Sequence, residues 1–317
     1  MRVGGRRMRV ATWRRWVDGE AFLAVLIWGA SFPIVKHGVD SFGPLGFAVV
    51  RLIVAIACLL LWLRWRGESL RIERADWPRL AVAGFGAMGL FQILFLVGMH
   101  HTTATHSALF LNTSPLWALP ISWLAERQRP RLGAIIGAVL GFAGVVAMIG
   151  RPEGEARSTL WGDLLTLGAA LCWVGLTLIP RPLVRRYGAV PITTWMLIAS
   201  LVVVSLLGFP ETMQSLHEVP GWGAWGALLY TGILAMVGAN VFWQRAVQRL
   251  GAATTLVYYY LQPGIALVLG AMFVGERIRV TQVIGIMAVF VGVLLAQRAG
   301  LQENVPRIAA PVTRRSP

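Results

Sequence analysis

The chain contains two similar halves, and this internal repeat limits the folds that it can adopt. Residues 107–115 read SALFLNTSP and residues 255–263 read TLVYYYLQP, so each run is apolar and ends in a polar residue close to a proline. A charged segment follows in each half, at 126–129 and at 276–279, and then a helix with spaced glycines. If each half crosses a membrane an odd number of times, the second half is inverted relative to the first.

The composition indicates a membrane protein rather than a soluble one. Of the residues, 56% are hydrophobic and 14% are charged, whereas a soluble domain has about 25% charged residues. Apolar stretches of about 20 residues, the length that crosses hydrocarbon, recur along the chain. We therefore expect an all-α integral membrane protein with ten transmembrane helices, arranged as two inverted-topology repeats of five. The expected spans are 20–38, 44–65, 78–99, 103–125, 131–150, 160–179, 190–209, 222–245, 252–275 and 280–297.

Four segments follow from this pattern. Residues 1–19 form a basic cytoplasmic N-terminal segment, 20–150 the first five-helix repeat, 160–297 the second, and 298–317 a disordered cytoplasmic tail. The basic start resembles that of a signal peptide. However, the first apolar stretch is full length and lacks a small-residue cleavage pattern, so we expect a retained span.

The net charge of +15 is explained by topology. Most of the 29 Lys and Arg residues lie on the expected side of the N-terminus, and Arg51 lies inside a span. Cationic residues flanking spans remain in the cytoplasm, so both termini are placed there, in an inner (plasma) membrane of the bacterial type. The arginines lie at the ends of the expected helices, which argues against nucleic acid as a partner. The expected partner is the lipid bilayer. The residues on the other side are Lys36, Arg151, Arg157, Arg277 and Arg279.

The repeat extends to the first helix of each half. In both halves this helix begins with an acidic residue, has a tryptophan in the middle and ends with a cation. The residues are Asp18, Trp28 and Lys36 in the first half and Asp163, Trp173 and Arg181 in the second.

These motifs together resemble a known family. The residues concerned are WGASF at 28–32 with Lys36, Arg51 after Pro44, and Pro115 and Pro263, each followed by a Glu-Arg pair. Over residues 20–297 the chain resembles EamA-type transporters of the drug/metabolite transporter superfamily. The resemblance implies export or exchange of amino acids, other metabolites or organic cations. It also implies a central cavity lined by the first, third and fourth helices of each half.

Polar and aromatic residues within the spans identify the same cavity independently. A polar side chain in a span normally faces protein or water, because burying it in hydrocarbon is costly. Asn240, Trp243 and Gln244 are spaced so that they share one helix face. An aromatic box with amide groups suits an uncharged or zwitterionic solute with an apolar side chain. The candidate substrate-binding residues are Trp28, Ser31, Phe91, Gln92, Asn112, Trp173, Asn240, Trp243, Gln244, Tyr258, Tyr259 and Gln262.

Structural interpretations of these residues stay open. Intramembrane amides often only join helices by hydrogen bonds, and buried tryptophans can be ordinary core residues. Pro33, Pro115 and Pro263 are interpreted as hinges or gates, although a proline can also be a tolerated kink. The small-residue spacing of Gly133, Gly137 and Gly141 predicts close helix packing.

Two ionisable residues have open roles. Arg51 is costly within a span and serves the structure, reaches the interface or attracts an anionic solute group. His106 either caps a helix in a loop or titrates in the pathway. No acidic residue lies deep in a span, so we expect no proton coupling through an intramembrane carboxylate. The two cysteines and the adjacent His100 and His101 make no metal site, and we expect neither metal nor cofactor.

The sequence therefore predicts an exporter or facilitator of small metabolites that works by alternating access. Amino acids, especially aromatic or large apolar ones, are the favoured substrate class, moved by passive uniport or exchange. Export of cationic or lipophilic drugs is the alternative. A membrane enzyme is disfavoured, because no acid lies beside the Ser and His at 106–107. We expect a monomer as the functional unit.

Overall fold

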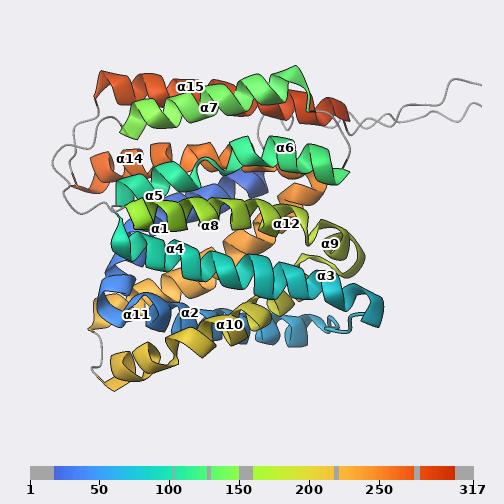
Figure 1. Ribbon diagram of the computed structural model, residues 1–317, viewed down its shortest axis with the longest axis vertical. Helices are drawn as coiled ribbons and strands as arrows, with labels where there is room; N and C mark the ends of the chain where they lie inside the picture. The colour runs from blue at the N-terminus through green and yellow to red at the C-terminus, as the bar shows by residue number, and fades with distance from the viewer. Residues whose placement is uncertain are drawn as a thin grey trace, which may run out of the picture.

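The computed structural model describes residues 18–102, 104–126, 130–149, 160–217, 221–274 and 279–303, and within these ranges all regular secondary structure is helical. The helices lie side by side in one bundle (Figure 1). The two predicted terminal segments, residues 1–19 and 298–317, fall largely outside the described residues.

The first half forms five successive helical stretches. They are α1 (Gly19–Phe42); α2 (Pro44–Arg66); η2 (Arg74–Asp76), α3 (Trp77–Ala81), η3 (Val82–Gly89) and α4 (Leu90–His101) in series; α5 (Ala104–Leu111) and α6 (Ser114–Glu126); and α7 (Leu132–Ile149).

The second half repeats this order. Its helices are α8 (Leu160–Leu178) with α9 (Arg181–Tyr187); α10 (Ala189–His217); α11 (Trp222–Leu229), η4 (Tyr230–Ala239) and α12 (Asn240–Leu250) in series; α13 (Ala252–Val257), η5 (Tyr258–Tyr260) and α14 (Leu261–Val274); and α15 (Val280–Glu303).

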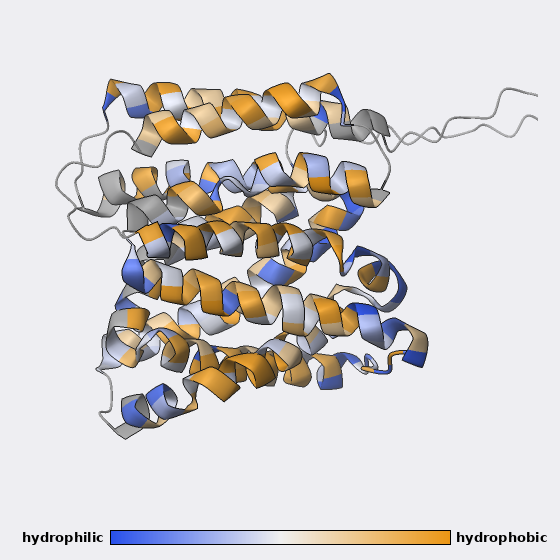
Figure 2. Cartoon of the chain, in the orientation of Figure 1, coloured by the Kyte–Doolittle hydropathy of each residue, from blue (hydrophilic) through white to orange (hydrophobic). Residues whose placement is uncertain are grey.

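Many of these helices have the length and composition of membrane spans. Within the described residues, six are long and apolar enough to cross a bilayer, and three shorter ones are also apolar. Figure 2 shows hydrophobic residues along the helices and hydrophilic residues concentrated towards their ends. The chain is therefore a multi-pass membrane protein.

The two halves share their turns. Gly43, between α1 and α2, has φ of 73°, and Gly188, between α9 and α10, has φ of 92°. Glycine adopts this left-handed region without a steric penalty. Each glycine lets the chain reverse sharply at the same point of its half.

Both halves also contain a π-helical segment in the same place. Val82–Gly89 precedes α4, and Tyr230–Ala239 precedes α12. π-helical turns are rare and occur frequently at functional sites. Because the segment occurs in both halves, the residues that follow it are candidates for a functional site.

The last helices of the two halves, α7 and α15, pack against each other at one edge of the bundle (Figure 1). A Cβ on Gly137 would lie 2.6 Å from the Gly292 carbonyl oxygen, and one on Gly285 would lie 2.6 Å from the Gly144 oxygen. The contacts run in opposite directions along the two helices, so α7 and α15 are antiparallel. Gly133 faces Ala299 at the end of the same interface.

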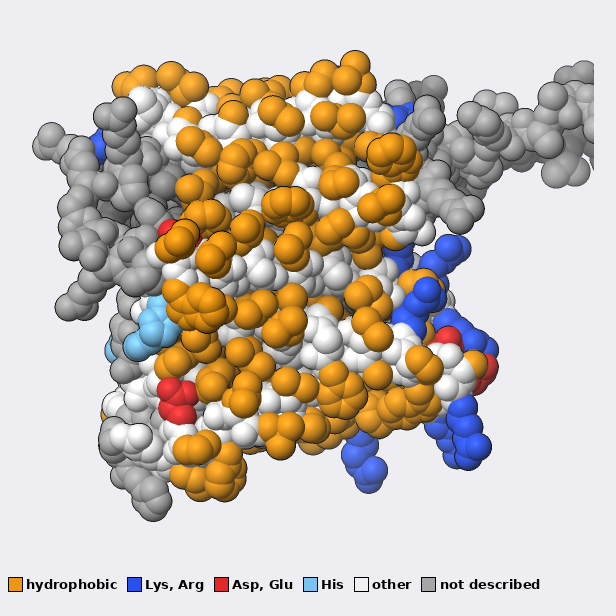
Figure 3. All heavy atoms as spheres, in the orientation of Figure 1, with side chains coloured by type: hydrophobic (Ala, Val, Ile, Leu, Met, Phe, Trp, Pro, Cys, Tyr) orange, Lys and Arg blue, Asp and Glu red, His pale blue; other side chains and the backbone are white. Residues whose placement is uncertain are grey.

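Charged side chains are distributed unequally between the two ends of the helices. On the face in Figure 3, Lys and Arg gather at the right-hand end, whereas histidine lies at the left-hand end. The described basic residues near α3 and α9 include Arg74, Arg79, Arg185 and Arg186. The middle of this face is hydrophobic, as contact with lipid requires.

Candidate functional site

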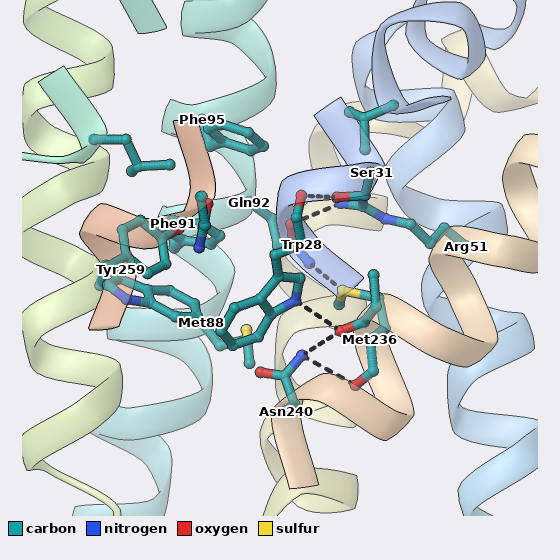
Figure 4. Close-up of a pocket in the computed structure, with 15 residues that line it drawn as sticks. Trp28, Ser31, Arg51, Met88, Phe91, Gln92, Phe95, Met236, Asn240 and Tyr259 are labelled. Carbon is teal, nitrogen blue, oxygen red and sulfur yellow. Dashed lines mark hydrogen bonds between the residues drawn. The ribbon is translucent and has the colours of Figure 1, made fainter. Parts of the chain in front are cut away.

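A small cavity lies between the two halves, deep in the bundle (Figure 4). Its volume is about 70 Å³, well below the ~300–1,000 Å³ of typical small-molecule sites. The cavity is therefore narrow in this structure. The lining residues are Trp28, Ser31, Val35, Arg51, Met88, Phe91, Gln92, Phe95, Leu111, Trp173, Ala235, Met236, Asn240, Tyr259 and Gln262.

Matching positions of the two halves meet across this cavity. Each half contributes a tryptophan from its first helix, a methionine and an amide from its third, and a large residue from its fourth. The cavity therefore lies at the interface between the two matching halves. The pairs are Trp28 with Trp173, Met88 with Met236, Gln92 with Asn240, and Leu111 with Tyr259.

Aromatic rings form one wall. The rings of Trp28 and Trp173 meet edge to face, with centroids 5.0 Å apart and an interplanar angle of 84°. Tyr259 lies 5.3 Å from Trp173, and Trp243 lies 5.4 Å from Trp28. Phe91 lies 5.2 Å from Trp173. Rings at these separations attract one another beyond the effect of area burial alone, so the wall is a connected cluster.

The π-helical segment η4 supplies carbonyl groups to side chains at the cavity. Trp28 Nε1 donates a hydrogen bond of 3.0 Å to the Ala235 carbonyl. Asn240 Nδ2 donates to the carbonyls of Ala235 and Met236, at 3.1 and 3.0 Å. A π-helical register leaves carbonyls without their usual i+4 partner. The Trp28 contact fixes the first helix of one half against the third helix of the other.

Arg51 brings a buried positive charge to the cavity from α2. Its side chain is 4% exposed, and its Nη2 donates to Gln92 Oε1 at 2.9 Å. The guanidinium carbon lies 5.2 Å from the centre of the Phe47 ring. Its Nε has no hydrogen-bond partner, and no carboxylate among the described residues forms an ion pair with it.

Four predicted site residues do not line the cavity. Trp243 stays within the aromatic cluster, but its Nε1 donates to Thr177 at 3.2 Å. Gln244 donates to the Leu176 carbonyl at 3.2 Å and so joins α12 to α8. The Tyr258 hydroxyl accepts the backbone N–H of Asp18 at 2.9 Å, which places it at the start of α1. Asn112 is fully buried, in the turn between α5 and α6.

The proline positions coincide with helix breaks in the fourth stretch of each half. α5 ends at Leu111 and α6 begins at Ser114, one residue before Pro115. The η5 turn separates α13 from α14, and Pro263 lies in the first turn of α14. The predicted span 103–125 is thus discontinuous. Pro33 lies within α1, although its side chain, like that of His106, falls outside the described residues.

Several lining residues could not be singled out from the sequence. Val35, Met88, Leu111 and Met236 are apolar residues in apolar helices, indistinguishable by composition from residues that pack in a core. The sequence left the role of Arg51 open, because its hydrogen-bond partner Gln92 lies on another helix, 41 residues away.

The cavity lining carries a single charged side chain. Among the described residues it contains no Asp, Glu or His, and no group of three metal-ligating side chains occurs in the described part of the chain. The site is chemically an aromatic and amide chamber with one guanidinium, suited to binding a solute.

Comparison with known proteins agrees with this architecture. A bundle of apolar helices in two matching halves around a central cavity defines a membrane transporter. The chain belongs to the EamA-like transporter family, which matches residues 16–150 and 160–297, once for each half.

Individual relatives match over most of their length. The uncharacterized transporter YyaM of Bacillus subtilis is 28% identical, covering 84% of this chain and 89% of the relative. A probable terminal-alkyne amino-acid exporter of Streptantibioticus cattleyicolor is also 28% identical, covering 88% and 92%. One crystal structure of a protein matches with a TM-score of 0.72 at 19% identity, covering 90% of this chain and 98% of that one. This last likeness concerns the fold alone.

Proposed function

We propose that the protein is a secondary transporter that exports or equilibrates small metabolites, most specifically amino acids with aromatic or large apolar side chains. The central observation is the narrow cavity, lined by matching residues of both halves. Inverted repeats characteristically place the substrate site at their interface, near the middle of the bilayer.

The chemistry of the lining supports the substrate class. Trp28, Trp173, Phe91 and Tyr259 offer ring faces to an apolar side chain, and Gln92, Asn240 and Gln262 offer amide groups. A relative at 28% identity carries the name of a probable amino-acid exporter. An amphipathic solute with one polar end and one apolar end fits such a lining.

The membrane arrangement follows the same proposal. The helical stretches represent ten spans, five per half, with both termini on the cytoplasmic side of a bacterial-type inner membrane. The gathering of arginines at one end of the bundle supports this orientation, because flanking cations remain in the cytoplasm. A reporter that is active only in the cytoplasm should be active when it is fused to the C-terminus. A reporter that is active only in the periplasm should be inactive at the same position.

Transport proceeds by rocking of one half against the other. The cavity of about 70 Å³ is too small for an amino acid, so the halves must move apart to admit the solute. The helix breaks before Pro115 and Pro263 provide points at which the fourth stretches can bend. Because the described lining carries no titratable acid, movement follows the solute gradient by uniport or exchange.

Flux in proteoliposomes tests this function. The full chain should carry labelled phenylalanine or leucine faster than empty vesicles do. Ala235→Trp, which fills the cavity, should abolish flux, whereas Ala143→Trp on an exposed position of α7 should not. Equal flux in the two variants, or no flux above empty vesicles across a broad amino-acid panel, contradicts the proposal.

The same measurement distinguishes the drug-exporter alternative. The tryptophan cluster could bind an organic cation through its ring faces, but Arg51 places a positive charge in the same lining. We therefore expect cationic dyes to be poor substrates. Protection of cells against toxic cations, without amino-acid flux, would favour the alternative.

A further inference from the structure

We propose that Arg51, oriented by Gln92, is the anion subsite of the central cavity and binds the carboxylate of the transported solute. This inference rests on the proposed transport function and specifies how the solute is oriented. It makes carboxylate-bearing solutes the ligand class of the site. Arg51 approaches the chamber from α2, and Figure 4 shows its side chain extending towards Gln92 and Ser31.

Arg51 has no acidic counter-ion among the described residues. A buried cation is normally paired, because removing a charge from water is costly unless a partner compensates. Arg51 is 4% exposed, and within the described residues it contacts an amide oxygen and a ring but no carboxylate. An anionic solute would supply the charge that the described residues do not supply.

The Arg51 guanidinium also has free hydrogen-bonding capacity. Gln92 occupies one amino group of the guanidinium, while Nε, which is buried, has no partner. A guanidinium binds a carboxylate through two parallel N–H groups. Arg51 therefore has a donor available to a carboxylate in a chamber that it lines.

Arg51 also breaks the symmetry between the two halves. Gly43 and Gly188 are matching glycines, and counting from them places Arg51 opposite Met196 in the second half. Met196 is fully buried. Met196 does not line the cavity, so the second helices contribute a charged side chain from the first half only, and the charge lies on one side of the chamber. A solute with a carboxylate at one end and an apolar group at the other fits that polarity.

Gln262, on α14, adds another amide to the cavity lining. Its side chain is 1% exposed, and its amide forms a hydrogen bond with the Tyr259 hydroxyl. Its oxygen can accept from an ammonium group. A zwitterion held between Arg51 and Gln262 would direct its side chain towards the tryptophan rings.

Three solutes that differ only in their polar end test the subsite. They are L-phenylalanine, its primary amide and 3-phenylpropionate, the last of which lacks the ammonium group. Competition with labelled phenylalanine is measured on the purified full chain. The wild type should bind both carboxylates at least tenfold more tightly than the amide.

Two variants separate charge recognition from a structural role. Arg51→Met introduces the residue found at the matching position, and it should remove the preference for carboxylates while keeping the unfolding temperature close to that of the wild type. Gln92→Glu gives Arg51 an internal counter-ion and should weaken carboxylate binding at least tenfold. Gln248→Glu, remote from the cavity, is the matched control. It should change neither carboxylate binding nor the unfolding temperature.

The outcomes distinguish this inference from the proposed function. If the wild type transports amino acids but binds the amide as tightly as the acid, the anion subsite is wrong and the transporter stands. If Arg51→Met lowers the unfolding temperature and leaves selectivity unchanged, Arg51 is structural. Should Arg51→Met not fold, unchanged selectivity in Gln92→Glu contradicts the subsite on its own. Absence of any flux or binding across the panel contradicts the function itself.

Discussion

Arg249, near the end of α12, forms a two-point ion pair with Asp18, the residue that caps α1. Its Nε and Nη2 donate to the Asp18 carboxylate at 2.9 and 2.8 Å, and its Nη1 donates to Glu20 at 2.6 Å. Arg245 adds a contact of 3.5 Å to Glu20. This cluster joins the first helix of one half to the third helix of the other at one end of the cavity.

The matching position in the other half makes a different contact. Asp163, near the start of α8, accepts a hydrogen bond of 2.6 Å from the Thr102 hydroxyl, just beyond α4. Thus the first helix of each half meets the third helix of the other half through an acidic residue. The pattern fits two gates at opposite ends of the chamber, of which the one at Asp18 is secured by ion pairs.

Arg249→Gln should favour opening at the Asp18 end. Exposed ion pairs contribute about 0.2–1 kcal/mol, and Arg249 is 44% exposed, so we expect the open population at this end to increase by about 1.4-fold to fivefold. Maleimide labelling of a cysteine introduced at Ser31, in the cavity lining, measures this opening. Arg66→Gln, which loses only the contact of 3.9 Å with Glu68, is the control. Equal labelling in both variants contradicts the gate.

The same ion pair should be insensitive to pH across the physiological range. Burial alone would raise the pKa of Asp18, but the bonds from Arg249 and from the Ala21 N–H outweigh it and hold the pKa below its ordinary value of 3.8. A depressed carboxyl pKa means that the stabilisation is present above the ordinary value and is lost as the pH falls through the depressed one. The ratio of the labelling rate with Arg249 intact to that in Arg249→Gln should therefore stay constant from about pH 5 to 8, because ionisation of the introduced cysteine changes both rates alike; Asp18→Asn should resemble the strongly acidified protein. A transition near neutrality would show that another group controls this end.

Gly137→Ala should destabilise the protein, because the added Cβ would meet the Gly292 carbonyl oxygen at 2.6 Å. Overpacking of this kind costs about 1–3 kcal/mol. Gly226→Ala adds the same atom at a helical position with nothing within 4 Å, so it should be neutral or slightly stabilising. Thermal unfolding in detergent compares the two. An unfolding temperature that falls equally in both variants would refute close packing of α7 on α15.

Trp28→Phe should weaken binding of aromatic amino acids several-fold without unfolding the chain. The change keeps an aromatic ring but removes the N–H that donates to Ala235; such a hydrogen bond contributes about 1 kcal/mol. Trp222→Phe, at a position that is 90% exposed, controls for the substitution itself. The dissociation constant for phenylalanine is the measurement. Unchanged affinity in the first variant would remove Trp28 from the site.

The sequence predicted the architecture better than the details of the chamber. Apolar runs of span length and the repeated tryptophans in the first helices are local signals, so the positions of the helices and the pairing of Trp28 with Trp173 follow from them. By contrast, the π-helical segments have no clear sequence signal. These segments precede Gln92 and Asn240 and so affect how the two amide side chains are oriented towards the cavity.

Some site residues depended on tertiary contacts that periodicity does not contain. Tyr258 and Tyr259 are neighbours and equally polar, yet one caps the start of α1 and the other lines the chamber. Arg51 in isolation could serve structure or substrate. Only the absence of a described carboxylate around it, together with Met196 at the matching position, distinguishes the two interpretations.

The central claim is that the two ends of the chamber open alternately, and paired distance measurements test it most directly. Spin labels at Gly19 and Arg185 report the end near Asp18, and labels at His100 and Leu160 report the end near Asp163; all four positions are exposed. Cys58 and Cys172 are replaced first. Addition of a transported amino acid should lengthen one distance while shortening the other. Two distances that stay constant during transport, or that change in the same direction, would contradict the account.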